Sequence, residues 1–260
     1  MSLMRPISQI ASLTLTAAVL VTAQRAVAGS QYVVLSAEPA VDELPPGKLF
    51  MPSDVINVPA GTVVTLLGED GSVNALSGPD SFVVTEDALT SGSLQGTAKA
   101  QEGPSKLDLI AVLLANERKR TESIGGSRTT SDYSTPSGLD DPWAVSIEES
   151  APGCIRDGVM VLAREGIGQS AVFSIRIGDG EPFNGIVWSA GKLTYSLPDR
   201  IPPEVKSVVV ETNKTSASIE IKMFPKNVLE NPLEVLGWMV SSGCKRQALA
   251  LVHQLVTKQQ

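Results

Sequence analysis

Histidine and cysteine are almost absent from the sequence, which contains one histidine, His253, and two cysteines, Cys154 and Cys244. A Ser-His-Asp or Cys-His catalytic centre would have to use His253. That residue points away from the apolar stripe of a predicted C-terminal helix, as a surface residue does. One histidine and two distant cysteines cannot supply the spaced ligands of a zinc site. We therefore expect no catalytic residue, no metal site and no cofactor.

Positive charge is also scarce, with 21 lysines and arginines against 28 acidic residues. Without Arg5 and Arg25, which precede residue 29, the balance becomes −9. A protein this acidic is a poor binder of nucleic acid or anionic lipid through bulk charge. Nucleic acid is therefore not an expected partner.

No apolar run reaches the roughly 20 residues that a membrane-spanning helix needs. The longest run, residues 10–23, follows Arg5 and is followed by Ala26-Val27-Ala28. A basic start, a short apolar run and a small-x-small site are typical of a cleaved signal peptide. We predict cleavage between Ala28 and Gly29 and export to a bacterial periplasm, with a mature chain that does not span the membrane. An uncleaved anchor or a buried helix is the alternative.

Turn residues are abundant, with 22 glycines and 17 prolines spread along the chain. They separate short apolar runs that predict strands. In the first part these are residues 48–51, 54–58, 62–67, 72–76 and 81–85. Asp70-Gly71 between two such runs predicts a hairpin. Ser105 and Asp108 form a capping box that begins a helix, which we expect to end at the basic triplet 118–120.

A stretch rich in Ser, Thr and Gly, residues 121–141, predicts an interdomain linker. Seven strands are expected after it, at 143–148, 158–164, 171–177, 185–189, 192–197, 205–211 and 217–223. The predicted fold is mainly β. A small N-terminal β domain (29–120) ends in a helix, and an immunoglobulin-like β-sandwich (142–260) has a C-terminal helix packed on it.

The C-terminal helix has the clearest signals. Asn231 is a predicted N-cap and Pro232 occupies the first turn. Its apolar stripe consists of Leu233, Leu236, Val240, Cys244, Ala248, Leu251 and Leu255. Residues 241–243, Ser-Ser-Gly, are where we expect a kink or a split.

The two cysteines predict a disulfide, because an exported chain with an even count of cysteines meets oxidising conditions. Cys154 is expected in a loop of the sandwich and Cys244 on the apolar stripe of the last helix. A bond between them would fix the helix to the sandwich. Two buried free thiols are the alternative.

Several short patterns match catalytic or binding motifs without their usual context. Ser189–Lys192 and Ser242–Lys245 have the Ser-x-x-Lys spacing of penicillin-binding proteins. The first is predicted in a turn and the second on a helix, and neither has the partner motifs. Asp179-Gly-Glu181 lacks further calcium ligands and predicts a hairpin turn. The basic triplet 118–120 fits a helix end better than an anion site.

Residues 46–83 resemble the extracytoplasmic β domain of FecR-like proteins. The matching elements are Gly47-Lys48-Leu49, the segment 55–61 with its Val-Pro-Ala-Gly end, the segment 66–71 with its acidic-Gly turn, and Leu76-Ser77-Gly78-Pro79. Residues 238–247 resemble the tail of uncharacterised exported proteobacterial proteins. The resemblance implies an envelope protein that signals to a membrane partner, although FecR proteins use a membrane helix and a cytoplasmic part that this chain does not show.

Two classes of function follow, besides a third in which the chain is an envelope protein with only a structural role. The first is an exported binding or scaffold protein of the cell envelope with an envelope or membrane protein as partner. The alternative is a periplasmic hydrolase that uses carboxylates such as Glu148, Glu149 or Asp157. Converging carboxylates in a deep pocket would favour the hydrolase. A flat apolar patch or an exposed strand edge would favour the binding protein.

Overall fold

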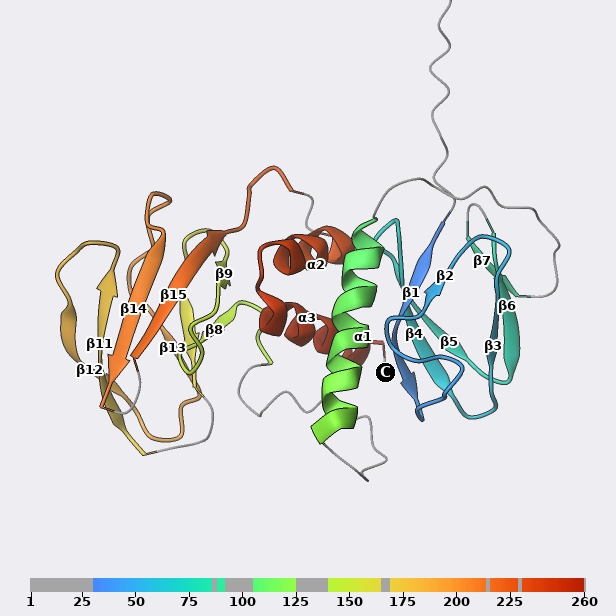
Figure 1. Ribbon diagram of the computed structural model, residues 1–260, viewed down its shortest axis with the longest axis horizontal. Coiled ribbons are helices and arrows are strands. Elements are labelled where there is room, and N and C mark those ends of the chain that lie inside the picture. Colours follow the sequence, from blue (N-terminus) through green and yellow to red (C-terminus); the bar gives the residue numbers. More distant parts are fainter. Residues whose placement is uncertain are drawn as a thin grey trace, which may run out of the picture.

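The computed structural model of the protein describes residues 30–85, 88–91, 105–124, 140–164, 169–213, 216–228 and 231–259. These residues form fifteen strands and three helices, so the chain is mainly β as predicted. Figure 1 shows an N-terminal β domain and a β-sandwich with helices between them. The predicted signal peptide with its Ala28–Gly29 site and most of the predicted linker lie outside the described residues. None of the three helices is long and apolar enough to cross a membrane.

The N-terminal domain consists of two small antiparallel sheets with strand orders β2-β1-β4-β5 and β3-β6-β7. The strands are β1 (Tyr32–Glu38), β2 (Leu49–Phe50), β3 (Val55–Val58), β4 (Val63–Gly68), β5 (Val73–Ser77), β6 (Asp80–Val84) and β7 (Leu89–Ser91). Val34, Ile56 and Leu66 lie in the core between the sheets. Val33 and Leu35 point to the other side of β1 and are buried against the helices. Because both faces of β1 are covered, its sequence is apolar without alternation.

The β-sandwich packs a five-stranded sheet, β12-β11-β14-β15-β9, against a three-stranded sheet, β13-β10-β8. The strands are β8 (Ala144–Ser146), β9 (Gly153–Ile155), β10 (Val161–Ala163), β11 (Ala171–Ile177), β12 (Phe183–Trp188), β13 (Thr194–Ser196), β14 (Ser207–Thr212) and β15 (Ser216–Met223). Phe173, Trp188 and Val208 are among the side chains buried between the sheets. The loop expected around Cys154 is strand β9, which pairs in parallel with β15. Strand β9 was missed by the sequence analysis because a strand of three residues is too short to show the alternation of apolar and polar residues that predicts a strand.

The helices are α1 (Lys106–Ile124), α2 (Pro232–Ser241) and α3 (Lys245–Thr257). The predicted capping box begins α1: the Ser105 N–H donates to Asp108 (2.6 Å), and the Asp108 N–H donates to Ser105 Oγ (3.2 Å). The expected end at Arg120 is wrong, because α1 continues to Ile124. Lysine and arginine are good helix formers, so a basic triplet alone does not stop a helix.

The predicted C-terminal helix is split where the Ser-Ser-Gly segment lies. Gly243 has φ +83° between α2 and α3, a conformation that glycine adopts readily. The break changes which residues of α3 face the core. Leu251 and Leu255 of the predicted stripe are only partly buried, whereas Val252 and Val256 are buried.

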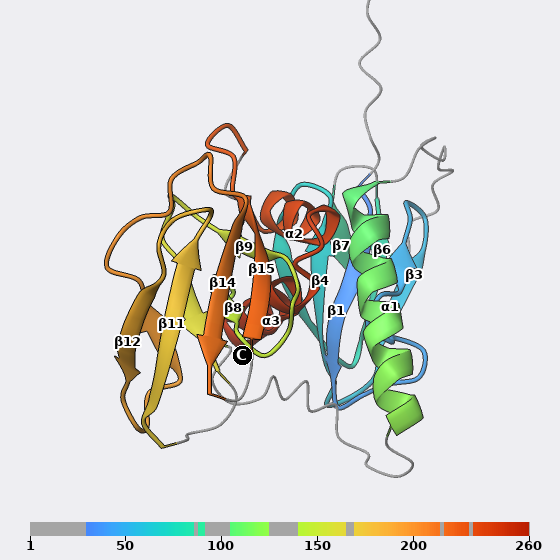
Figure 2. The same ribbon diagram turned by 60° about the vertical axis from the view of Figure 1, so that its left-hand side comes forward.

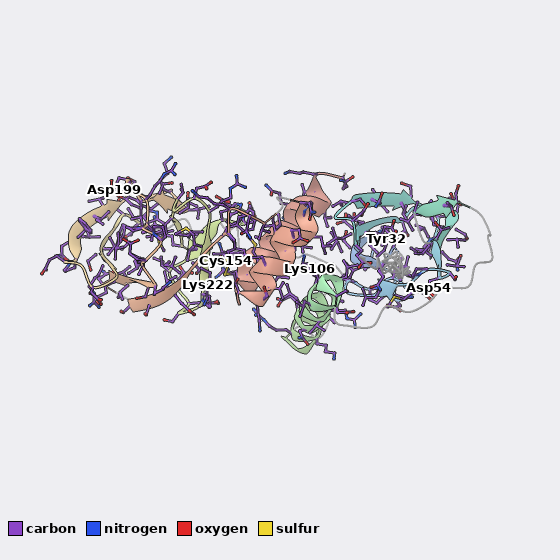
Figure 3. All side chains as sticks on the ribbon, turned by 90° about the horizontal axis from the view of Figure 1, so that it is seen from above. Tyr32, Asp54, Lys106, Cys154, Asp199 and Lys222 are labelled. Carbon is purple, nitrogen blue, oxygen red and sulfur yellow. A yellow bond between two sulfur atoms is a disulfide. The ribbon has the colours of Figure 1, made fainter. Side chains whose placement is uncertain are left out.

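The C-terminal helices share a core mainly with the N-terminal domain, rather than packing chiefly on the sandwich. Leu236 and Met239 of α2 and Ala248 of α3 are buried together with Leu114 of α1 and Leu35 of β1. The sandwich contributes Cys154 and Phe224 to this core. Figure 3 shows Cys154 on the sandwich side of the helices and Lys106 beside them on α1.

Candidate functional site

The predicted pairing of Cys154 with Cys244 is the one that the structure has, with the two Cα atoms 6.0 Å apart. Both residues are buried. The buried side chain of Gln247 strengthens the same junction. Its oxygen accepts from the Cys154 N–H (2.7 Å), and its amide nitrogen donates to the carbonyls of Cys154 (2.8 Å) and Pro142 (3.0 Å). This arrangement joins β9 to α3 and serves structure rather than chemistry.

The carboxylates considered for a hydrolase lie on the surface of the sandwich. Glu148 and Glu149 follow β8, and Asp157 lies in the turn after β9; all three are exposed. Glu149 Oε1 is 3.9 Å from Arg246 Nη1, and Asp157 Oδ2 is 3.9 Å from Arg156 Nε. None of the three lines either of the two surface hollows described below. Within the described ranges, no group of three or more His, Cys, Asp or Glu side chains is arranged to hold a metal ion.

The motif matches are parts of turns. Ser189–Lys192 is the turn between β12 and β13, where the Lys192 N–H donates to the Ser189 carbonyl (3.3 Å). Ser242–Lys245 was expected on a helix and instead spans the break between α2 and α3. Asp179–Glu181 lies in the β11–β12 hairpin turn, as predicted. His253 is on α3 and only partly buried.

The two edges of the larger sheet have very different surroundings. The β9 edge is buried, and its Cys154 is bonded to the helical layer. The β12 edge lies at the opposite side of the sheet, away from the helices (Figure 2). Phe183 and Val187 on β12 are 58% and 59% exposed, and Val172 on the neighbouring β11 is 58% exposed. One edge is therefore closed and the other open and apolar.

The outer face of the sheet beside this edge carries both apolar and charged side chains. Val172 on β11 lies directly opposite Val187 on β12. Further along β11, Ser174 lies opposite Glu211 and Arg176 opposite Val209, both on β14. A hollow of about 290 Å³ is lined by Ser174, Arg176, Pro182, Val209 and Glu211. In the described part of the chain, neither Arg176 nor Glu211 makes an ion pair or a side-chain hydrogen bond.

A buried arginine fixes the end of β12. Arg164 donates from Nε to the Lys192 carbonyl (3.1 Å), from Nη1 to the Gln169 carbonyl (3.2 Å) and from Nη2 to the Ser189 carbonyl (3.1 Å). Its guanidinium carbon is 5.1 Å from the centre of the Trp188 ring, whose Nε1 also donates to the Lys192 carbonyl (3.0 Å). We call Arg164, Trp188 and the 189–192 turn the arginine clamp.

We expect Arg164→Lys to lower the free energy of unfolding by about 2 kcal/mol, because one ammonium group cannot bond three carbonyls in the directions that the planar guanidinium reaches. Urea unfolding followed by tryptophan fluorescence measures the change. Arg176→Lys is the matched control, since Arg176 is exposed and makes none of these bonds. Equal stability of both variants would show that the clamp does not hold the turn.

A second hollow, of about 480 Å³, lies in the N-terminal domain and is lined by Asn57, Val58, Pro59, Pro79, Asp80 and Ser81. Its polar groups bond one another. Ser81 Oγ donates to Asn57 Oδ1 (2.8 Å), and the Ser81 N–H donates to Asp80 Oδ1 (2.7 Å). These bonds engage the polar side chains of this hollow with one another.

An unusual carboxylate, Glu69, lies in the β4–β5 turn. The turn lies close to the N-termini of α1 and α2. Asp108, in the first turn of α1, is near enough to affect the pKa of Glu69, and a Cβ atom at Gly71 would meet Asn231, the N-cap of α2. Oε2 of Glu69 is buried and has no hydrogen-bond partner among the described residues. Burial raises the pKa of Glu69 above its ordinary value of 4.5; Asp108 raises it further, and a hydrogen bond with the backbone of Gln31 opposes the rise.

This raised pKa predicts a direction of pH dependence. The folded state holds the Glu69 proton more tightly than the unfolded state, so stability falls as pH rises from the ordinary glutamate pKa through the higher folded value. We expect Glu69→Gln to raise the urea midpoint at pH 7 and to leave it nearly unchanged at pH 4. Glu204→Gln, at an exposed position, is the control. A lower midpoint for Glu69→Gln at pH 7 would contradict the assignment.

The open edge was missed by the sequence analysis, which placed its strand at residues 185–189 instead of 183–188. One signal was present, because the segment Phe-Asn-Gly-Ile-Val-Trp contains no charged residue. Edge strands are usually protected by charge, so such a segment indicates either a covered strand or a contact surface. Only the order of the strands in the sheet distinguishes a covered strand from a contact surface.

Known proteins offer no guide to the role of this edge. No family model matches the chain, and no curated protein and no solved structure is similar to it. The resemblance of residues 46–83 to FecR-like domains therefore stays an expectation from the sequence.

Proposed function

We propose that the mature chain is a non-catalytic binding or scaffold module of the bacterial cell envelope that engages a partner protein through the β12 edge. The observation that carries the proposal is the contrast between the two edges of the larger sheet. The β9 edge is joined to the helices by a disulfide, whereas the β12 edge exposes Phe183 and Val187. Open sheet edges template pairing with other chains, and proteins usually block them unless they serve as contacts.

The composition of the edge supports a contact surface. Charged residues, proline or an inward-pointing lysine would protect an edge strand, and β12 has none of them. The one irregularity is a register shift near Gly185, which has φ +71°. It leaves Ile186, Val187 and Trp188 in regular pairing with β11. The arginine clamp holds the end of this regular segment.

The proposed location rests on the predicted signal peptide and is compatible with the buried disulfide, because such bonds persist in oxidising compartments. The FecR-like resemblance of the N-terminal domain adds the proposal that binding is passed on to an envelope or membrane protein. In this arrangement the sandwich recognises the partner, and the helical layer joins the sandwich to the N-terminal domain. No observation favours the alternative hydrolase.

Site-specific photo-crosslinking in the cells that normally make the protein tests the proposal. A photoreactive amino acid replaces Val187 in one variant and Val159 in the other. Val159 is the matched control, an exposed valine of the sandwich that lies outside the larger sheet. We expect a light-dependent adduct with an envelope protein from position 187 and none from position 159. No adduct from 187, or equal adducts from both, would overturn the proposal.

A further inference from the structure

We infer that the occupant of the β12 edge is an extended segment of a partner protein that adds a sixth strand to the sheet and carries an acidic side chain four residues from an apolar one. This inference rests on the proposed function and goes further by stating the chemistry of the partner. It has three supports: the edge position of β12, the exposed valine pair and Arg176, which has no charged partner among the described residues.

The backbone supplies the first contact. An edge strand pairs on one side only, so every second residue directs its N–H and C=O groups away from the sheet. The regular segment 186–188 and the clamp behind it hold these groups in strand geometry before a partner arrives. An added strand gains main-chain hydrogen bonds from any sequence, so these bonds give affinity, and the side chains on the outer face give specificity.

The valine pair selects an apolar side chain. Val172 and Val187 lie opposite each other on the outer face, and each is more than half exposed. A residue of the added strand that lies opposite Val187 would extend this row to three strands. Cross-strand pairs of β-branched side chains stabilise a sheet, so valine or isoleucine fits best there.

Arg176 selects an acidic side chain. It is four residues from Val172 on the same face of β11, a separation of about 13 Å along the strand. On the edge side it shares the hollow with Pro182, the residue that precedes β12. A carboxylate from an added strand would form a charge-assisted hydrogen bond with the free guanidinium. Glu211, on the β14 side, would repel an acidic group that reached further across the sheet.

The same reasoning disfavours a second copy of this chain. Two β12 strands paired about a two-fold axis could bring their Val187 side chains together, but β12 contains no acidic residue to neutralise Arg176. A partner segment with its own carboxylate satisfies both the apolar and the charged part of the face.

The test is selection from a phage-displayed library of random nine-residue peptides on the disulfide-bonded chain of residues 29–260. We expect the enriched peptides to share a β-branched residue with aspartate or glutamate four positions away. Their affinity should fall at least tenfold on Val187→Lys and on Arg176→Glu, but not on Val159→Lys. Replacing the peptide's acid with lysine should restore binding to Arg176→Glu, which a variant that merely misfolded would not show.

Three results would overturn the inference. They are enrichment of peptides without the acidic residue, equal binding to Arg176→Glu, and a dimer in sedimentation that Val187→Lys dissolves. The last result would assign the edge to a second copy. If crosslinking from position 187 captures an envelope protein while any of these results holds, the proposed function stands and only the strand-addition chemistry fails. If no adduct forms, the proposed function itself fails.

Discussion

Replacing both Cys154 and Cys244 by alanine is expected to lower the free energy of unfolding by about 4–5 kcal/mol. The bond closes a loop with a sequence separation of 90 residues. Opening such a loop raises the conformational entropy of the unfolded chain, which lowers the free energy of unfolding by that amount. The loop contains strands β10 to β15 and helix α2, so the constraint acts on most of the sandwich and on its attachment to the helices.

Urea unfolding of the oxidised chain, the reduced chain and the double variant measures this effect. Reduction should bring the wild-type midpoint close to that of the double variant, and reductant should not move the midpoint of the variant. Gln247→Leu is a useful comparison, because it leaves the loop closed but removes three hydrogen bonds at the same junction. A double variant as stable as the oxidised wild type would show that the pair is not bonded in the isolated protein.

Replacing Gly47 by alanine is expected to cost about 4 kcal/mol, because two penalties combine. Gly47 has φ +85°, which costs a non-glycine residue about 1–2 kcal/mol. A Cβ atom there would lie 2.6 Å from the Ala111 carbonyl oxygen and 3.0 Å from the Ala115 nitrogen, both backbone atoms of α1. Backbone cannot rotate away as a side chain does, so α1 must move off the sheet, with an overpacking cost of about 1–3 kcal/mol.

Gly61→Ala separates the two penalties. Gly61 also has a left-handed conformation, φ +73°, but a Cβ atom there would meet nothing within 4 Å. This variant should therefore lose only about 1–2 kcal/mol, the cost of the backbone conformation. Thermal and urea unfolding of the two variants give the comparison. Equal losses would mean that the contact of Gly47 with α1 contributes nothing to the seating of the helix.

Most of the individual strands, turns and helix starts could be predicted, because the interactions that form them join residues that are close in sequence. The Asp70-Gly71 turn, the capping box at Ser105 and the strand 171–177 all depend on neighbours in sequence. The break at Gly243 shows where such reasoning ends. It was expected as a kink or a split, but the rotation of α3 that buries Val252 in place of Leu251 depends on the packing that follows the break.

The partners of the C-terminal helices could not be predicted, because an apolar stripe does not state which apolar surface it covers. Leu236 and Ala248 fit a sandwich or a helical core equally well by pattern. The candidate edge had the same difficulty. The uncharged run from Phe183 to Trp188 fits a central strand as well as an edge, and strand order is set by long-range pairing.

The shared core of β1 and the C-terminal helices has a consequence for biosynthesis. Val33 and Leu35 are made well before residues 232–257, which contain the helices that bury them. A nascent N-terminal domain therefore presents one apolar face of β1 until residues 232–257 have emerged. Contacts so distant in sequence form slowly, and the exposed strand is prone to aggregation in the interval. The order of synthesis therefore favours wrong pairing of β1 until residues 232–257 are in place.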